Sequence, residues 1–496
     1  MEEYKKRCST TNDKSILIIG GGPSGMVACK YLAKKHNVLC IEGKEEVGGL
    51  WYINKVADDS DPSLKMDAYM KEYGYQAGSI YENLILNGIK VVQVFKGFPA
   101  KLEYDEFMKC EDFMQYLLDY TKHHDFRKNI KFNSFVTSVR LTKNLNEEEQ
   151  KKYDNPTKRF VVDICNSKDY TKDNHSLEAD YVLVCNGHYS VPNMPNVLNE
   201  NLFKGTIKHS HHFRWDFNKD YHNKHLVLLG VGISSQDIQC ILMKRSDIKP
   251  KKITMIGGKS SLDCLRKSES WREEIANGSM DFKDGTISQF TGDNSILLQS
   301  GEVINGVDHV LYCTGYQYSF PFIEKNNHVD HLIEFNNKTR TSVGPFYKRT
   351  FNIHEPNIIF IGLTHTNFQT IMGLERNVIL AQRYIEGFVT LPSKEEMMKS
   401  YQEDIQASLK YNPDGRFYLR TVLDEEGFTD FKLFKQMQEL SGVPADQQFD
   451  YFYKEFIYPY YQKFCEDGEF WKLKQVKFET IDKKISPDYA LKEGYF

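Results

Sequence analysis

The fold is decided by residues 14–42, which read KSILIIGGGPSGMVACKYLAKKHNVLCIE. The apolar run at 15–19 has the length and the branched side chains of a buried parallel strand. Apolar residues then recur at helical spacing over 26–35, and a second apolar strand is expected over 37–41. The order strand, glycine turn, helix, strand and acid predicts a dinucleotide-binding unit.

The glycine turn matches the pattern G-x-G-x-x-G at Gly20, Gly22 and Gly25. The first glycine allows a tight turn, the second lets the backbone approach a pyrophosphate, and the third permits close packing of helix and strand. The helix N-terminus adds positive dipole toward the phosphates. Glu42 ends the second strand, where its carboxylate can accept hydrogen bonds from ribose hydroxyls. We therefore predict a dinucleotide site, and the alternative is a glycine-rich turn that serves packing alone.

The next segment, EEVGGLW at 45–51, would bring backbone and the Trp51 ring close to the same ligand. In flavoproteins with two nucleotide sites, a flavin lies at this place. A disulfide reductase would carry a redox-active cysteine pair soon after such glycines, so that a thiolate could reach the flavin. The next cysteine is Cys110, which argues against that class.

A second unit of the same kind starts with LVLLGVGISS, followed by a helical pattern over 236–244 and a strand over 252–256. Its turn keeps Gly230 and Gly232. Ser235 takes the place of the third glycine, where a small residue still permits packing of helix and strand. The pattern predicts a second nucleotide site, with simple packing as the alternative.

The residues after the second strand of this unit bear on the choice of nucleotide. They read IGGKSS and offer no carboxylate to hold a free 2′-hydroxyl. The ammonium of Lys259 could pair with a 2′-phosphate instead. The sequence therefore favours NADP over NAD, and use of NADH stays open.

The composition is that of an ordinary globular protein with room for two or three domains, because 496 residues are 40% hydrophobic and 27% charged. The 64 Lys and Arg against 68 Asp and Glu give a formal net charge of -4, and no basic stripe suggests a nucleic-acid partner. No stretch approaches the roughly 18 apolar residues of a membrane span, and the N-terminus lacks a signal-peptide core. The ten cysteines are scattered without a C-x-x-C pair, which is typical of thiols in a reduced compartment. We expect a cytoplasmic protein.

The segment between the two units resembles the flavin-containing monooxygenase family. The family fingerprint F-x-G-x-x-x-H-x-x-x-F/Y is met at Phe203, Gly205, His209 and Phe213. The related Baeyer–Villiger enzymes have Trp at the last position, and Trp215 two residues later keeps that alternative open. A metal site in the histidines at 209, 211 and 212 is disfavoured, because no carboxylate or cysteine stands at ligand spacing.

Other segments extend the resemblance over nearly the whole chain, and the trimethylamine monooxygenase-like branch is the most similar. They are NGIK at 87–90, NGH at 186–188, SSQDI at 234–238, CTGY at 313–316 and LPSKEEM at 391–397. Two positions depart from that branch. Gly257-Gly258 stands where an arginine grips the 2′-phosphate, and Thr364-His-Thr-Asn367 replaces aromatic residues expected near the flavin.

The resemblance implies an α/β protein of the two-domain flavoprotein type, with two Rossmann-like domains and a mainly helical C-terminal extension. The predicted parts are 14–192 and 313–390 for the FAD-binding domain, 193–312 for an inserted NADP-binding domain, and 391–496 for the extension. The segments 310–316 and 357–362 are expected to return to the first domain. The charged tract 144–159 is expected to form a solvated loop.

The implied activity is an NADPH- and O2-dependent oxygenation of a soft nucleophile, an amine such as trimethylamine or a sulfide, through a C4a-hydroperoxyflavin. Asn87 is the expected catalytic residue, hydrogen-bonding near flavin N5 and C4a and the nicotinamide. His209 is expected to be a hinge or packing residue. The expected FAD ligands are Gly20, Gly22, Ser24, Gly25, Glu42, Lys44, Gly49, Leu50, Trp51, Asn87, Val136 and Thr364, and the expected NADP ligands are Gly230, Gly232, Ser234, Ser235 and Lys259.

Two other functional classes stay open at this point. One is a flavin-dependent NADPH oxidase whose true product is H2O2. The other is a nucleotide sensor that keeps the fold and binds partners through its last hundred or so residues, without consuming NADPH. The family likeness also suggests a homodimer, whereas nothing suggests a bound metal, a nucleic acid or a membrane partner.

Overall fold

The computed structural model describes most of the chain up to residue 444. The residues it leaves undescribed are 11–12, 54–78, 82–83, 91–92, 154–155, 170, 214–220, 325–329, 336–339, 365–369, 411–418, 420–422, 425–426 and 445–496. Trp215, the residues at 365–367 and most of the predicted C-terminal extension therefore lie outside the described residues.

The first unit is built on a sheet of seven described strands in the order β20-β21-β22-β7-β1-β2-β3. At its centre, β1 pairs in parallel with β2 on one side and with β7 on the other, and every residue of β1 and β2 is buried. The predicted strands are thereby confirmed. Their bounds are β1 Ser15–Ile19, β2 Asn37–Ile41, β3 Ile130–Lys131, β7 Tyr181–Val184, β20 Phe346–Tyr347, β21 Phe351–Asn352 and β22 Ile358–Phe360.

Helices α2, Pro23–Leu32, and α10, Thr370–Ile385, pack together over this sheet. The expectation of a helix over 26–35 is shifted by three residues. The helix begins at Pro23 because proline suits the first helical turn, where its missing N–H costs nothing. Gly22 precedes it in extended backbone, at φ -72° and ψ -176°.

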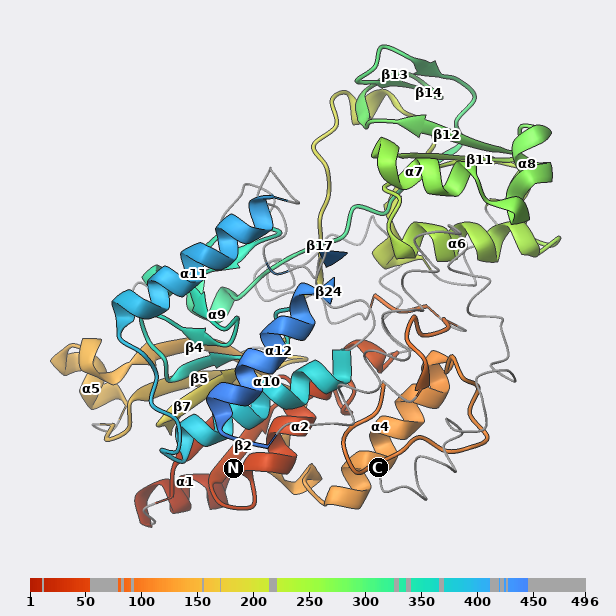
Figure 1. Cartoon of the computed structure of the whole chain (residues 1–496). Coiled ribbons are helices and arrows are strands. Elements are labelled where there is room, and N and C mark those ends of the chain that lie inside the picture. The colour runs from red at the N-terminus through yellow and green to blue at the C-terminus, as the bar shows by residue number, and fades with distance from the viewer. Residues whose placement is uncertain are drawn as a thin grey trace.

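The second unit is built on five described strands in the order β12-β11-β10-β16-β9, all paired in parallel. Helices α6, Ile233–Lys244, and α7, Lys259–Arg266, follow β10 and β11. Figure 1 shows this unit, in green, above the first one. Its strands are β9 Thr206–His209, β10 His225–Leu229, β11 Lys252–Gly257, β12 Met280–Asp284 and β16 His309–Tyr312.

The position of β16 corrects one expectation. The segment from 310 was expected to return to the first unit, but β16 pairs with β10 and β9 in the second sheet. Val310 and Tyr312 are buried in the core of that unit. A short apolar strand fits either sheet by its pattern, so only the pairing decides between them. The strand at 357–362 does return to the first sheet, as β22.

The chain crosses between the two units twice, and the crossings run side by side. Strand β8, Val191–Pro192, pairs in antiparallel fashion with β17, Tyr316–Gln317. Asn193 adds hydrogen bonds between the crossings, because its Nδ2 donates to the carbonyl of Thr314 at 3.2 Å. This two-stranded ribbon joins the units.

Smaller elements complete the structure. The tract at 144–159 was expected to be a loop, but it contains α5, Glu147–Lys152, because Asn146 and Glu149 form a reciprocal capping box. The remaining elements are α1 Glu2–Thr10, α4 Cys110–His124, α8 Arg272–Ala276, α9 Pro321–Glu324, α11 Lys394–Leu409, α12 Thr429–Ser441, β4 Ser134–Leu141, β5 Phe160–Asn166, β6 His175–Ala179, β13 Ile287–Gly292, β14 Ser295–Leu298, β15 Val303–Ile304, β18 Glu334–Phe335, β19 Val343–Gly344, β23 Leu423–Asp424 and β24 Gly427–Phe428.

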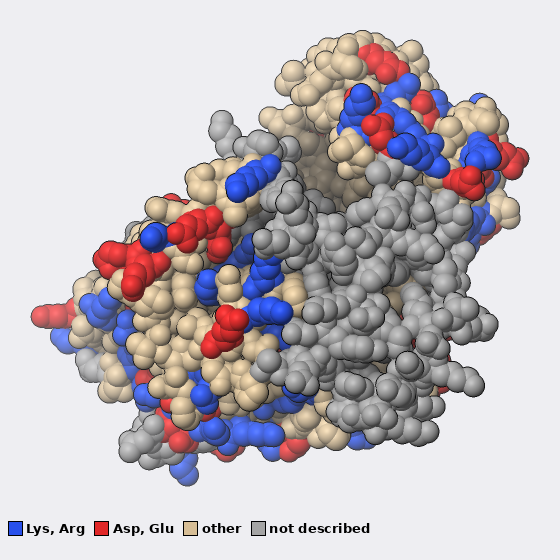
Figure 2. Space-filling model, in the orientation of Figure 1, with Lys and Arg blue, Asp and Glu red and all other residues tan. Residues whose placement is uncertain are grey.

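The surface carries charges of both signs. On the face drawn in Figure 2, the described Lys and Arg side chains are interspersed with Asp and Glu. None of the described helices is long and apolar enough to cross a membrane. The six cysteines at positions 29, 40, 110, 165, 185 and 240 are buried free thiols.

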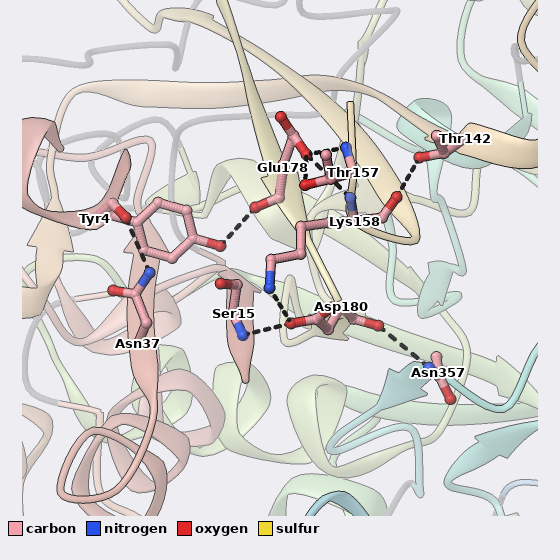
Figure 3. A network of polar contacts seen from close by, with 9 residues as sticks. All are labelled: Tyr4, Ser15, Asn37, Thr142, Thr157, Lys158, Glu178, Asp180 and Asn357. Atoms are coloured by element: carbon pink, nitrogen blue, oxygen red, sulfur yellow. Dashed lines mark hydrogen bonds and ion pairs between the residues drawn. The ribbon is translucent and has the colours of Figure 1, made fainter. Parts of the chain in front are cut away.

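A polar network ties the amino ends of the strands to the antiparallel sheet β4-β5-β6 (Figure 3). Asp180 accepts hydrogen bonds from the backbone N–H of Ser15 at 2.8 Å and forms an ion pair with Lys158 at 3.3 Å. Its backbone carbonyl accepts from Asn357 at 3.2 Å. Asp180 thus holds β1 and the start of β22 from one position.

Asp180→Ala is expected to lower the free energy of unfolding by about 1–3 kcal/mol, because the N–H of Ser15 loses its acceptor. Urea denaturation followed by circular dichroism measures this change. Asp293→Ala is the matched control, since Asp293 pairs with Lys204 at 2.7 Å with its side chain 65% exposed. The control should stay within about 0.5 kcal/mol of the parent protein. Equal losses in both variants would contradict the role of Asp180.

Candidate functional site

A cavity of about 1560 Å³ runs between the two units. It lies at the carboxyl ends of β1, β2 and β7 in the first sheet and of β10 and β11 in the second. In open parallel sheets, ligands bind at this edge. Both glycine turns line the same cavity, so a ligand in one turn can reach a ligand in the other.

The first turn requires glycine at two positions for packing. Gly20 has φ +104°, and a Cβ there would lie 2.5 Å from the carbonyl oxygen of Cys185. A Cβ on Gly25 would lie 1.9 Å from the carbonyl oxygen of Gly20. Gly25 therefore permits the close approach of α2 to the turn and does not itself line the cavity.

The second glycine of this turn has a different environment. Gly22 lines the cavity and faces Gly49, so that a Cβ on Gly22 would lie 3.4 Å from the Cα of Gly49. The two loops are joined by a hydrogen bond from the N–H of Gly48 to the carbonyl of Gly21 at 3.1 Å. Gly22 and Gly49, which have no side chains, thus form a cradle at the N-terminus of α2. This cradle fits a pyrophosphate.

Glu42 lies at the end of β2 and is buried, with an exposed fraction of 6%. Its carboxylate accepts from the backbone N–H of Gly21 at 2.5 Å and of Lys44 at 2.8 Å. Burial raises the pKa of Glu42, and these backbone hydrogen bonds oppose the rise. Glu42 lines the cavity, where its carboxylate can also accept a hydrogen bond from a ribose hydroxyl.

Lys44 holds the loop that follows. Its ammonium donates to the carbonyl oxygens of Gly49 at 2.8 Å and Tyr52 at 3.2 Å. Trp51 ends the short helix Gly49–Trp51, and its ring packs edge-on against Phe113 at 4.7 Å between centroids. Lys44 and Trp51 both line the cavity.

Two polar atoms near the cavity are buried without a hydrogen-bond partner among the described residues. They are Oδ1 of Asn87 and Oγ1 of Thr364. A buried polar atom without a partner costs free energy that a bound ligand can restore. These orphaned atoms and the side-chain-free cradle fit a large polar ligand such as FAD.

The second turn repeats the geometry of the first. Gly230 has φ +105°, and a Cβ there would lie 2.4 Å from the carbonyl oxygen of Cys313. Gly232 is open, with no atom within 4 Å of an added Cβ. Ser235 is fully buried and donates from its hydroxyl to the carbonyl of Gly232 at 2.8 Å, so a small residue does serve at the third position.

The structure brings most of the predicted site residues together. Three of them lie off the cavity wall: Gly25 and Ser235 pack within their turns, and Lys259 is exposed at the N-terminus of α7. The residues that line the cavity are Gly20, Gly22, Ser24, Glu42, Lys44, Gly49, Leu50, Trp51, Asn87, Val136, Gly230, Gly232, Ser234 and Thr364.

His209, which was singled out by the sequence, is buried and uncharged at neutral pH. His209 ends β9 with an exposed fraction of 1%, and its Nδ1 accepts from the N–H of His211 at 3.0 Å. Burial lowers the pKa of His209 to about 3. Its ring lies edge-on to Tyr316 of β17 at 5.4 Å between centroids, so His209 packs where the ribbon meets the second sheet, and its role as a hinge stays a prediction. Burial likewise lowers the pKa of His188, which lines the cavity, to about 4.

The family is now decided by comparison with known proteins. A model of the flavin-binding monooxygenase-like family matches residues 13–249 and 268–416. The chain belongs to this family.

Relatives within the family share about a quarter of the sequence. The flavin-containing monooxygenase FMO GS-OX-like 8 of Arabidopsis thaliana is 28% identical over 414 residues, which is 79% of each chain. The senecionine N-oxygenase of Tyria jacobaeae is 24% identical over 431 residues, covering 86% of this chain and 83% of the relative. The chain thus spans most of the length of these flavin monooxygenases.

Solved structures share the two-domain flavin monooxygenase fold. The S-allyl-L-cysteine S-oxygenase from Allium sativum has a TM-score of 0.70 and 19% identity over 97% of both chains. Tmm from Pelagibacter sp. strain HTCC7211 has a TM-score of 0.64 and 20% identity over 86% of both. OTEMO, solved in complex with FAD and NADP, has a TM-score of 0.56 and 12% identity over 86% of this chain and 98% of OTEMO.

Some cavity residues were missed by the sequence analysis. Ser260 and Ser261 of α7 line the second-unit end, and Phe434 of α12 lines the first-unit end. The two serines immediately follow Lys259 in the quoted segment IGGKSS, but they were not predicted to line the site. Phe434 stands in a segment without any recognised motif, and only the packing of α12 brings it to the cavity.

Proposed function

We propose that this flavin monooxygenase uses FAD and NADPH to transfer one oxygen atom of O2 to a soft nucleophile, an amine nitrogen or a sulfide sulfur. The observation that carries the proposal is the continuous cavity that joins the two glycine turns. NADPH in the second turn can then reduce a flavin held in the first. One oxygen atom goes to the substrate and the other leaves as water, with NADPH and a proton as the source of reducing equivalents.

The residues of the first unit suggest how FAD would lie. Glu42 ends β2 on one side of the α2 N-terminus, and Gly362 follows β22 on the other side. With the adenosine ribose at Glu42 and the pyrophosphate at Gly22, the residues at the ends of β7 and β22 would hold the flavin half of FAD. Thr364 lies on that side and Asn87 also lines the cavity, so both orphaned polar atoms can face the flavin half.

The cofactor supplies the oxygen chemistry when it is bound, and the protein binds, orients and excludes water. Asn87 offers a carbonyl oxygen and an amide to the reacting edge of the flavin and to the nicotinamide. His188 stays neutral above about pH 4, so this cavity residue brings no proton to the site at neutral pH. The hydrogen bonds that Asn87 can offer and the neutral state of His188 both favour oxygen transfer over unproductive release of H2O2.

The relatives leave the substrate atom open between nitrogen and sulfur, since one is named an N-oxygenase and another an S-oxygenase. We therefore propose the shared chemistry, a soft nucleophile small enough for the cavity. Trimethylamine and a dialkyl sulfide are suitable probes. Cyclohexanone tests the Baeyer–Villiger alternative.

The test is to measure NADPH consumed, H2O2 released and oxygenated product formed by the purified FAD-loaded protein with each probe. Product that rises at the expense of H2O2 would support oxygen transfer and would identify the substrate class. NADPH consumption with stoichiometric H2O2 under every probe would favour the oxidase. No NADPH consumption would favour a nucleotide sensor.

Lys259 is proposed to select NADPH. It stands at the N-terminus of α7, beside the cavity residues Ser260 and Ser261, in a segment that the family match skips. Lys259→Ala is expected to raise the KM for NADPH about two- to fivefold and to leave the KM for NADH unchanged, because an exposed charge pair is worth under about 1 kcal/mol. Lys267→Ala makes the same charge change at the other end of α7. Equal effects of Lys259→Ala on both nucleotides would remove it from the 2′-phosphate.

We also propose the domain limits 14–192, 193–312, 313–390 and 391–496, supported by the two sheets. A cytoplasmic location is supported by the buried free thiols. The homodimer stays a prediction.

A further inference from the structure

Helix α12, Thr429–Ser441, lies beyond residue 416, where the family match ends. One of its residues nevertheless reaches the cavity. Phe434 is 1% exposed and lines the cavity together with Ile371, Leu374 and Asn377 of α10. A part of the site wall therefore comes from a segment that the family match leaves out.

A glycine in α10 makes room for this ring. A Cβ on Gly373 would lie 2.4 Å from Cζ of Phe434. Glycine inside a helix is destabilising by roughly 0.5–1 kcal/mol relative to alanine, so its place opposite the ring has a packing reason. The ring fills the space that the missing side chain leaves.

Helix α12 lies along α10 (Figure 1) and is held there by polar contacts at Met437 and Ser441, on the C-terminal side of Phe434. Asn377 donates from its Nδ2 to Oγ1 of Thr350 at 2.8 Å and to Sδ of Met437 at 3.5 Å. Arg383 donates to the carbonyl oxygen of Ser441 at 3.1 Å. These contacts fix the position of the helix that carries the ring.

Phe434 belongs to the β22 side of the cavity. Leu374 lines the same cavity as Phe434. A Cβ added to Gly362 would lie 2.9 Å from Leu374 and 2.7 Å from the hydroxyl oxygen of Ser24. Phe434 contacts Gly373, the residue before Leu374, and therefore lies against the part of α10 that packs at Gly362, on the β22 side of the sheet. Under the proposed orientation of FAD, this is the flavin half of the cofactor.

We propose that the ring of Phe434 closes the flavin end of the cavity against water. This inference rests on the proposed binding of FAD in the first glycine turn. An apolar wall at this place lowers the access of water to the flavin, which favours transfer of oxygen to the substrate over release of H2O2.

The test uses the FAD-loaded full chain and measures quenching of FAD fluorescence by iodide, which reports solvent access and needs no turnover. Phe434→Ala is expected to raise the quenching constant on the order of threefold, because the wall opens to solvent. Leu433→Ala is the matched control, since Leu433 is a buried residue of the same helix that does not line the cavity. The control should quench as the parent does.

Phe434→Leu is a second variant, for the case that Phe434→Ala does not bind FAD. Leucine keeps the wall apolar with a smaller side chain. Quenching near the parent value in this variant, with the rise confined to Phe434→Ala, would support the proposal. Equal quenching in all variants, or an equal rise in Leu433→Ala, would overturn it. Since the assay contains no NADPH and no substrate, a protein that makes no oxygenated product would refute the proposed activity while leaving this result interpretable.

Discussion

Gly22→Val is expected to give a folded protein that purifies without FAD. The backbone at Gly22 is extended, at φ -72°, so valine is allowed there, and the added Cβ would meet the Cα of Gly49 at 3.4 Å and its N at 3.8 Å. The branches of the side chain would instead occupy the cradle between the two glycine loops. Overpacking of this kind costs about 1–3 kcal/mol, which corresponds to a Kd for FAD that is weaker by about 5- to 150-fold. The flavin absorbance per protein after gel filtration measures the loss.

Gly232→Val is the matched variant in the second turn. Its backbone is the same, at φ -73° and ψ -178°, and an added Cβ would meet no atom within 4 Å. This variant should keep FAD and lose affinity for NADPH, with a KM raised by a similar factor. The reciprocal outcome, FAD lost from Gly232→Val and kept in Gly22→Val, would exchange the proposed roles of the two turns. Loss of both ligands from both variants would indicate misfolding.

Asn87→Ala is expected to keep FAD bound and to uncouple NADPH consumption from product formation. The Oδ1 of Asn87 is buried without a hydrogen-bond partner among the described residues and faces the cavity. An interaction of this amide with the reacting flavin edge is worth about 1–3 kcal/mol, so the yield of oxygenated product per NADPH should fall by about fivefold or more. Product and H2O2 are measured in parallel with trimethylamine and with a sulfide.

Asn201→Ala is the control for that experiment, because Asn201 is an exposed asparagine of the second unit that does not line the cavity. Its coupling should equal that of the parent. Asn87→Asp adds a further comparison, since aspartate keeps the shape but brings a charge. Unchanged coupling in Asn87→Ala would remove this residue from the reaction.

Much of the fold could be predicted because two of its units are local in sequence. The strand, glycine turn, helix and strand of residues 14–42 form one continuous stretch, so pattern and motif agree over a short distance. The same holds for the second turn at Gly230. The cavity position of Glu42 followed as well, because the carboxyl ends of neighbouring parallel strands meet at one edge.

The remaining features depend on contacts that pattern does not encode. The apolar strand β16 could join either sheet, and only its pairing with β10 decides the matter. The charged helix α5 is exposed and depends on a capping box that was not considered. Phe434 reaches the cavity through a glycine sixty-one positions earlier in the chain, and neither residue belongs to a recognised motif.

Because β8 and β17 form one ribbon, the second unit is an insertion in the first that could be removed as a whole. The strands by which the chain enters and leaves this unit, β8 and β17, are hydrogen-bonded to each other. The inserted segment therefore begins and ends at adjacent points. Rejoining the chain across so small a gap needs only a short loop, with a low entropic cost of closure. The second unit can therefore be removed or replaced without breaking any strand pairing of the first sheet.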